Sequence, residues 1–181
     1  MQPNKARADL RMDVALVAFL IGLDVVARLL PHAPGFMPIA ASALFAARVL
    51  RTPAFAPLVP IAAMGLSALV LGPDDWRISL IVTLAISLPA FAGMVTRRWP
   101  GIGSTIAVMV SCSLAFFALS NLAVWAFSGL YSHDLAGLTQ CYAAALPFLQ
   151  NTVAGDLFWT GVLFGGAWAI QNGAMLAGRA R

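Results

Sequence analysis

Long apolar runs separated by short polar segments dominate this chain. They lie at about residues 13–30, 36–50, 53–71, 78–95, 104–127 and 152–176. Crossing the hydrocarbon core of a bilayer takes about 20 residues of α-helix, and a helix satisfies its own backbone hydrogen bonds there. We therefore predict an all-α integral membrane bundle of about six transmembrane helices, forming a single domain over residues 1–181.

The composition agrees with a chain that is solvated largely by lipid. Hydrophobic residues make up 61% of it and charged residues 10%, whereas soluble domains carry about 25% charged residues. The net charge is +4, but the charges fall in short clusters between the apolar runs. This placement argues against nucleic acid as a partner and points to membrane topology.

Three details refine the predicted bundle. The run 36–50 is short for a span, so we expect it to be tilted or half-buried among its neighbours. Pro89 predicts a kink in the run 78–95. The outer connection 128–151 is too apolar in its second half for a free loop, and we predict a short helix there, lying in the interface or re-entering the bundle.

Basic residues gather at one end of the predicted bundle. With the N-terminus in the cytoplasm, the other side receives only Arg28 and Arg77, together with the acidic residues Asp74, Asp75 and Asp134. The cytoplasmic side receives Lys5, Arg7, Arg11, Arg48, Arg51, Arg97, Arg98, Arg179 and Arg181. By the positive-inside rule we predict that both ends of the chain are cytoplasmic.

Charged groups inside a span are rare and are usually paired or functional. Asp24 and Arg28 are four residues apart and so share a helix face. They form either a structural ion pair or a site in which Arg28 meets an anionic or polar ligand. His32, between Pro31 and Pro34, is either a solvated loop histidine or a contact to a ligand or metal.

Further polar and aromatic residues fall toward the same outer end. Asp156 either caps its helix or points into a polar cavity. Asn121 requires a partner in the bundle or a ligand, and Trp125 alone is typical of an interfacial aromatic belt. Convergence of such groups at one end of an apolar bundle predicts a pocket open to the outer side. The predicted ligand-binding residues are Arg28, His32, Phe36, Asn121, Trp125, Tyr131, Cys141, Tyr142, Asn151 and Asp156.

Enzyme signatures are weak. The chain has no G-x-S-x-G, H-E-x-x-H, P-loop or dinucleotide motif, and it has no Glu and only two His. Cys112 and Cys141 do not have a metal-ligand spacing, and nothing in the pattern requires a disulfide. We expect no enzyme activity, metal or cofactor, although a membrane enzyme using Cys141, His32 or Asp156 stays an alternative.

The segment Arg28-Leu29-Leu30-Pro31-His32-Ala33-Pro34-Gly35-Phe36-Met37-Pro38 resembles the opening signature of an uncharacterised family of small bacterial membrane proteins. That signature reads R-L-L-P-H-x-P-N-F-x-P and precedes a small-residue helix. Further matching segments are Val59-Pro60-Ile61-Ala62-Ala63-Met64, Ser120-Asn121 with Trp125, Gly137-Leu138, Cys141-Tyr142, Pro147-Phe148 and Gly155-Asp156. Two positions depart from the family pattern: Gly35 stands where Asn is common, and Ser67-Ala68 stands where Ser-Asp is common.

The family in turn is similar to the S components of energy-coupling-factor vitamin transporters. This resemblance implies a bacterial inner-membrane protein with a vitamin-like ligand and an energising transporter module as partner. S components carry small-residue docking motifs on their first helix. Here Ala43-x-x-x-Ala47, in the second run, has that spacing.

Two functions are therefore expected. The first is a substrate-binding membrane subunit for uptake of a small micronutrient. In it Arg28 would meet a polar group of the ligand, and Trp125, Tyr131 and Tyr142 would contact a ring. The alternative is a structural or assembly subunit of a larger membrane complex.

Overall fold

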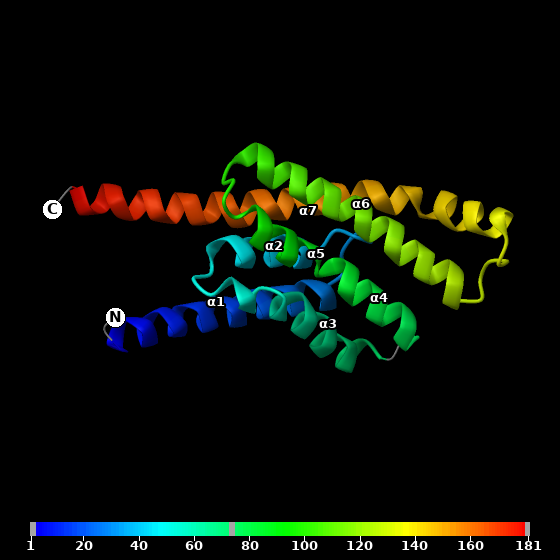
Figure 1. The fold of residues 1–181 in the computed structure, drawn as a ribbon, viewed down its shortest axis with the longest axis horizontal. Helices are drawn as coiled ribbons and strands as arrows, with labels where there is room; N and C mark the ends of the chain where they lie inside the picture. The colour runs from blue at the N-terminus through cyan, green and yellow to red at the C-terminus, as the bar shows by residue number, and fades with distance from the viewer. Residues whose placement is uncertain (1–2, 73–74, 180–181) are drawn as a thin grey trace.

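The computed structural model of the chain describes residues 3–72 and 75–179, and these form a bundle of helices (Figure 1). The helices are α1 (Pro3–Leu29), α2 (Ile39–Val49), the 3-10 turn η1 (Pro53–Phe55), α3 (Leu58–Leu71), α4 (Trp76–Ile86), α5 (Leu88–Thr96), α6 (Ile102–Phe127) and α7 (Leu135–Arg179). Because η1 leads into α3 and α4 into α5, the described chain contains six helical segments. The predicted all-α class is confirmed. Asp74 and Arg181 lie outside the described residues.

Four of the segments in the described chain are long and apolar enough to cross a membrane: Pro53–Leu71, Trp76–Thr96, Ile102–Phe127 and Leu135–Gly173. Their outward faces are apolar, with Leu69 82% and Ile102 81% exposed. Such a surface is compatible with lipid and not with water. The helix α1 is long enough as well, but Asp13, Asp24 and Arg28 interrupt its apolar character.

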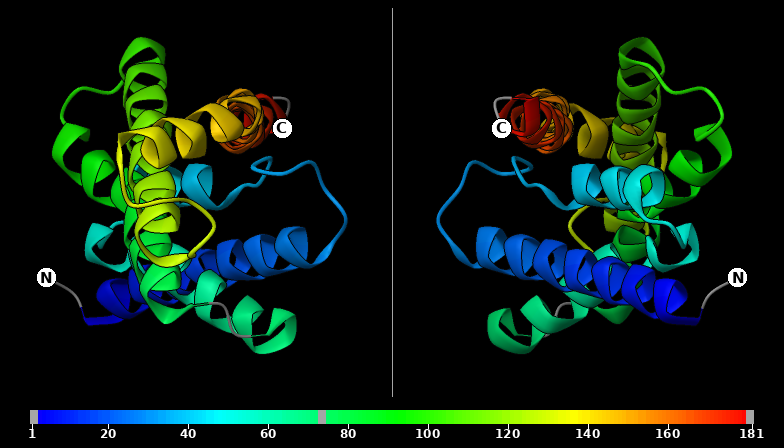
Figure 2. Two further views of the ribbon diagram at one scale, coloured as in Figure 1. Left: turned by 90° about the vertical axis from the view of Figure 1, so that its right-hand side faces the viewer. Right: turned by 90° about the vertical axis from the view of Figure 1, so that its left-hand side faces the viewer.

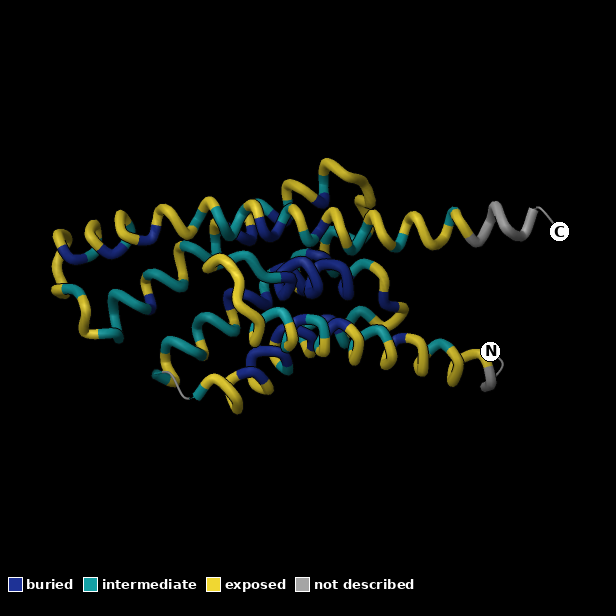
Figure 3. The backbone as a smooth tube through the Cα atoms, turned by 180° about the vertical axis from the view of Figure 1, so that it is seen from behind, coloured by how far each residue is buried: buried dark blue, intermediate teal, exposed yellow. Residues whose placement is uncertain are grey.

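The short helix α2 occupies the centre of the bundle. Residues 39–47 are all buried, and Figure 3 shows this stretch as the largest continuous buried segment. It packs against α1, α3, α5, α6 and α7. A Cβ added at Gly93 of α5 would lie 2.7 Å from the Ala47 Cβ, so the two helices are in close contact. The second helix is thus buried more completely than the tilted or half-buried helix that we expected.

The segment 76–96 is broken in the middle. Helix α4 ends at Ile86 and α5 begins at Leu88. Pro89 has no N–H to bond the Ala85 carbonyl, and the Ala90 N–H bonds the Ser87 carbonyl at 3.0 Å. The Ser87 hydroxyl donates to the Thr83 carbonyl at 2.7 Å. The kink predicted at Pro89 is therefore present as an interruption of regular α-helical pairing.

Helix α7 differs from the expectation. The prediction placed an outer connection at 128–151 with a separate short helix, but α7 is continuous over 45 residues from Leu135 and includes Pro147. At 1.5 Å per residue it is about 68 Å long, more than twice the ~30 Å hydrocarbon core. Viewed along the long axis, its first part leans away from the remainder (Figure 2). A bend near an internal proline is expected.

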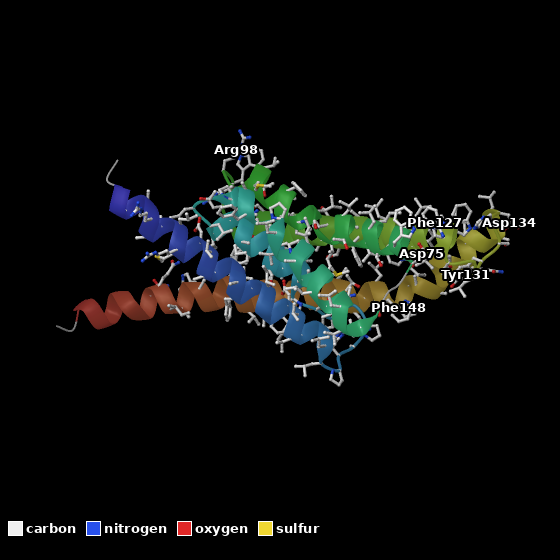
Figure 4. All side chains as sticks on the ribbon, turned by 90° about the horizontal axis from the view of Figure 1, so that it is seen from below. Asp75, Arg98, Phe127, Tyr131, Asp134 and Phe148 are labelled. Carbon is white, nitrogen blue, oxygen red and sulfur yellow. The ribbon has the colours of Figure 1, made fainter. Side chains whose placement is uncertain are left out.

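The two ends of the bundle differ in charge. Arg98 lies at one end, while Asp75, Tyr131 and Asp134 lie at the other (Figure 4). At the basic end, Arg48 donates to Thr105 Oγ1 at 2.5 Å and to Thr96 Oγ1 at 3.1 Å. These contacts tie α2 to α5 and α6, so part of the basic cluster also holds helices together.

The same end joins α1 to the α2–η1 turn. The Asp13 carboxylate accepts hydrogen bonds from the backbone N–H groups of Arg51, at 3.1 Å, and Thr52, at 2.8 Å. Asp9 forms an ion pair with the Arg51 side chain. The N-terminal part of α1 is therefore fixed by polar contacts at a point where water or lipid headgroups can meet the charges.

Candidate functional site

A cavity of about 180 Å³ lies between the α1–α2 loop, the α4–α5 break, α6 and α7. Its wall is Gly35, Met37, Ala40, Ala85, Ile86, Pro89, Cys112, Phe116, Thr152 and Asp156. Most of these groups are apolar. An apolar hollow with few polar groups is the usual form of a small-molecule site.

The α1–α2 loop is pressed closely onto α7 at one side of the cavity. Gly35 has φ +81°, a conformation that favours glycine. A Cβ at Gly35 would collide with Thr152 Oγ1, and one at Gly155 would lie 2.8 Å from the Phe36 Cα. Glycines at both positions therefore let the loop reach the helix beside Asp156.

Asp156 is the acidic group of the wall and is 4% exposed. Its Oδ2 lies 2.5 Å from the Ser113 hydroxyl on α6, whose single hydrogen is shared between this oxygen and the Met109 carbonyl at 2.9 Å. The described part of the chain offers no hydrogen-bond donor to Oδ1. A buried carboxylate requires a partner that offsets its desolvation, and here one oxygen has such a partner and the other has space in the cavity.

The polar groups beside Asp156 also act mainly as acceptors. The Thr152 hydroxyl donates its hydrogen to the Phe148 carbonyl at 2.9 Å, which leaves oxygen lone pairs for other contacts. Ala85 and Ile86, just before the break at Pro89, also line the wall. Cys112 contributes a thiol, and it is 8% exposed.

The fully buried Asp24 lies outside this wall. Asp24, on α1, has no exposed surface, and its Oδ1 accepts a hydrogen bond of 2.8 Å from the Ser42 hydroxyl on α2. Arg28, one turn later, donates to Met64 Sδ on α3 at 3.2 Å. These contacts join α1 to α2 and α3, the two helices beside it.

The sequence of this cavity-forming chain matches the model of a family of unknown function, DUF6580, over residues 8–177. The chain belongs to this family. No curated protein and no solved structure matches it. The match covers nearly all of the described helices, so the cavity, Asp24 and Asp156 lie within the DUF6580 region.

Several predicted site residues of this DUF6580 member lie in the hairpin formed by α6 and α7, away from the cavity wall. The Trp125 indole donates to the Ser132 carbonyl at 2.9 Å, and the Tyr142 hydroxyl donates to the Ala118 carbonyl at 2.6 Å. Cys141 Sγ donates to the Asn121 carbonyl at 3.4 Å. Cys141 and Tyr142 therefore join α7 to α6, and Trp125 bonds to the turn between the two helices.

The remaining predicted residues are dispersed. The Asn121 amide donates to the Phe117 carbonyl at 2.8 Å, within α6. Tyr131 lies beyond the end of α6, at the acidic end (Figure 4). His32 is exposed on the α1–α2 loop. Asn151 is half-buried on α7, next to the cavity residue Thr152.

Of the predicted set, the structure brings only Asp156 to the cavity wall among the described residues, with Phe36 packed beside it. Phe36 also contacts Phe158, at 5.4 Å between ring centroids. Sequence reasoning did not select Cys112, Phe116 or Thr152. The signal that could have indicated the cavity was the Pro89 kink. Non-helical backbone inside an apolar bundle is tolerated where it is buried in protein or lines a cavity.

The described residues contain no group of three or more His, Cys, Asp or Glu side chains that could hold a metal ion. Chemically, the cavity can hold a small molecule, orient it by hydrogen bonds to acceptor groups, and exclude water from it.

Proposed function

We propose that the protein is a substrate-binding membrane subunit for uptake of a small micronutrient, and that the cavity beside Asp156 is its binding site. The observation that carries the proposal is the cavity itself, with one buried carboxylate directed by Ser113 and an otherwise mainly apolar wall. Sites of this form bind small molecules. The resemblance to S components of vitamin transporters supports the same function.

The proposal includes an orientation. The basic end, with Arg98, faces the cytoplasm of a bacterium, and the end with Asp134 faces outward across the inner membrane. The ligand enters from the outer side, past the α1–α2 loop that contacts α7 at Gly155. An energising transporter module is the proposed partner for release on the inner side.

The test is native mass spectrometry of the gently purified protein, with released small molecules identified. We expect a stoichiometric small molecule that is lost in Ala85→Leu, because leucine fills the cavity beside the α4–α5 break. Ala107→Leu is the matched control, since Ala107 is exposed on α6. If the molecule were retained by Ala85→Leu and lost in Trp125→Ala, the binding site would lie in the α6–α7 hairpin and not in the cavity.

A second candidate function is a subunit of a larger membrane complex. Ala43 and Ala47 do not provide its docking face, because both are fully buried inside the bundle. Gly161 and Gly165 of α7 have the G-x-x-x-G spacing, and a Cβ at either would meet no atom within 4 Å. Close helix pairing uses such positions. A protein partner that co-purifies and is lost in Gly161→Leu, with no small molecule present, would favour this function.

A further inference from the structure

We infer that the cavity binds a small organic cation, an amine in its ammonium form, with the Asp156 carboxylate as its counter-charge. The inference rests on the proposed function, because it names the ligand class of the same site. It differs from the sequence-based expectation, in which Arg28 meets an anionic or polar group. Arg28 contacts Met64, and the cavity is lined by Asp156.

The charge of the wall is the first argument. Among the described residues the wall contains one acidic side chain and no Lys, Arg or His. An anionic ligand would meet the Asp156 carboxylate without a compensating charge, which is strongly unfavourable away from water. An ammonium group supplies the opposite charge that the buried carboxylate requires.

The hydrogen-bonding character of the wall is the second argument. Asp156 Oδ1 has no donor within the described chain, while Oδ2 is occupied by Ser113. Thr152 has given its hydrogen to the Phe148 carbonyl. These groups accept hydrogen bonds, and an ammonium group has only donors to offer. A ligand whose polar end is an acceptor would leave the same groups unsatisfied.

The size and apolarity of the wall are the third argument. A cavity of about 150 Å³ lined by apolar side chains holds benzene, and this one measures about 180 Å³. It therefore accepts a body of roughly that size, against Ile86, Pro89 and Phe116. A bare Ca²⁺ or Mg²⁺ ion would require about six oxygen ligands, which so apolar a wall does not provide.

Cys112 gives a test that can be made before the ligand is identified. The chain has two cysteines, so Cys141→Ser leaves Cys112, in the cavity wall, as the only thiol. Three small methanethiosulfonate reagents then report the local charge: aminoethyl, which is cationic, sulfonatoethyl, which is anionic, and methyl, which is neutral. In each reaction the Cys112 thiolate attacks the reagent's sulfenyl sulfur, a disulfide forms, and methanesulfinate leaves.

We expect the cationic reagent to modify Cys112 at least about tenfold faster than the anionic one, after each rate is normalised to that of the detergent-unfolded chain. The preference should disappear in Asp156→Asn and persist in Asp134→Asn, because Asp134 lies at the end of the bundle. The inference would be overturned by equal rates, by a faster anionic reagent, or by a preference that survives in Asp156→Asn. The cavity would then remain a proposed binding site, but for a ligand of another charge.

A second measurement needs no substitution at Asp156. Benzylamine, benzyl alcohol and benzoate fit the cavity by size and differ in charge and donors. In the Cys141→Ser protein, benzylamine should slow modification of Cys112 by the methyl reagent, and benzoate should not. Protection by benzoate alone would overturn the inference. If none of the reagents reached Cys112 in the folded protein, the cavity would be closed to solutes and the proposed function itself would fail.

Discussion

A Cβ atom added to Gly155 of α7 would lie 2.8 Å from the Cα of Phe36 in the α1–α2 loop. Phe36 backbone atoms cannot move as a flexible side chain would, so this contact limits residue 155 to glycine. The contact also holds the loop beside the cavity, next to Asp156. The loop and α7 therefore form one wall only because the helix lacks a side chain at this position.

Gly155→Ala should accordingly destabilise the protein by about 1–3 kcal/mol, as expected for overpacking a close contact. Gly161→Ala is the control, because a Cβ there meets nothing within 4 Å. It should be neutral or stabilise by about 0.5–1 kcal/mol through helix propensity. Thermal unfolding in detergent, followed by circular dichroism, measures both. Equal effects of the two substitutions would contradict the close approach of Phe36.

The Ser42–Asp24 hydrogen bond joins α2 to α1 inside the bundle, and Asp24 is fully buried. We expect a double-mutant cycle with Ser42→Ala and Asp24→Ala to give a coupling of about 0.6–2 kcal/mol, the range measured for polar contacts between membrane helices. Unfolding by denaturant in mixed micelles provides the free energies. Ser111→Ala, on the exposed side of α6, should change little. A coupling near zero would show that the pair does not stabilise the α1–α2 contact.

The helices were largely predictable because hydrophobic length is a strong signal in the sequence. The runs 53–71, 78–95 and 104–127 correspond to helical segments, and Pro89 marks the break between α4 and α5. The continuity of α7 was not predictable in the same way, because the sequence analysis expected a separate short helix before residue 152. Residues 135–149 alternate small, polar and apolar side chains, and their helix is held by contacts to α6, such as that of Tyr142 with the Ala118 carbonyl.

The candidate site was harder to predict than the fold. Sequence position gives the height of a residue along a helix, but it gives the direction of the side chain only when the neighbouring helices are known. The sequence places Trp125, Cys141 and Tyr142 toward the same end of the bundle. In the structure, however, their polar atoms bond to the backbone of the α6–α7 hairpin and not to the cavity. Cys112 has the pattern of a core residue, yet it lines the cavity together with Pro89 of the helix break.

The orientation in the membrane can be tested at two exposed positions. Trp99 follows Arg98 at the basic end, and Leu130 lies in the α6–α7 turn, 75% exposed. In a chain without its own cysteines, Leu130→Cys should react with a membrane-impermeant maleimide in intact spheroplasts. Trp99→Cys should react only after permeabilisation, because basic segments stay in the cytoplasm. The reverse pattern would invert the proposed topology, and labelling of both positions would indicate mixed insertion.

The first turn of α7 should loosen in acid. The Gly137 N–H donates to the Asp134 carboxylate at 2.7 Å and the Ser132 hydroxyl donates at 2.9 Å. These hydrogen bonds hold the pKa of Asp134 below its usual range, and the bond from Gly137 has the largest effect. Because the folded pKa is lower than the unfolded one, the carboxylate stabilises the helix start at neutral pH. That contribution is lost as the pH falls from the usual pKa of an aspartate through the lowered pKa of Asp134 in the folded protein.

Hydrogen exchange of the amides at 136–138 measures this loss. It should accelerate on acidification, relative to the intrinsic exchange rate, and in Asp134→Asn the dependence on pH should disappear. Asp75, at the start of α4, is the internal comparison. Its pKa is lowered to about 2, first by the side-chain hydrogen bond from Arg77, so protection of that helix start should persist to more acidic pH. Loss of protection at both helix starts over the same pH range would indicate general unfolding and contradict a local role for Asp134.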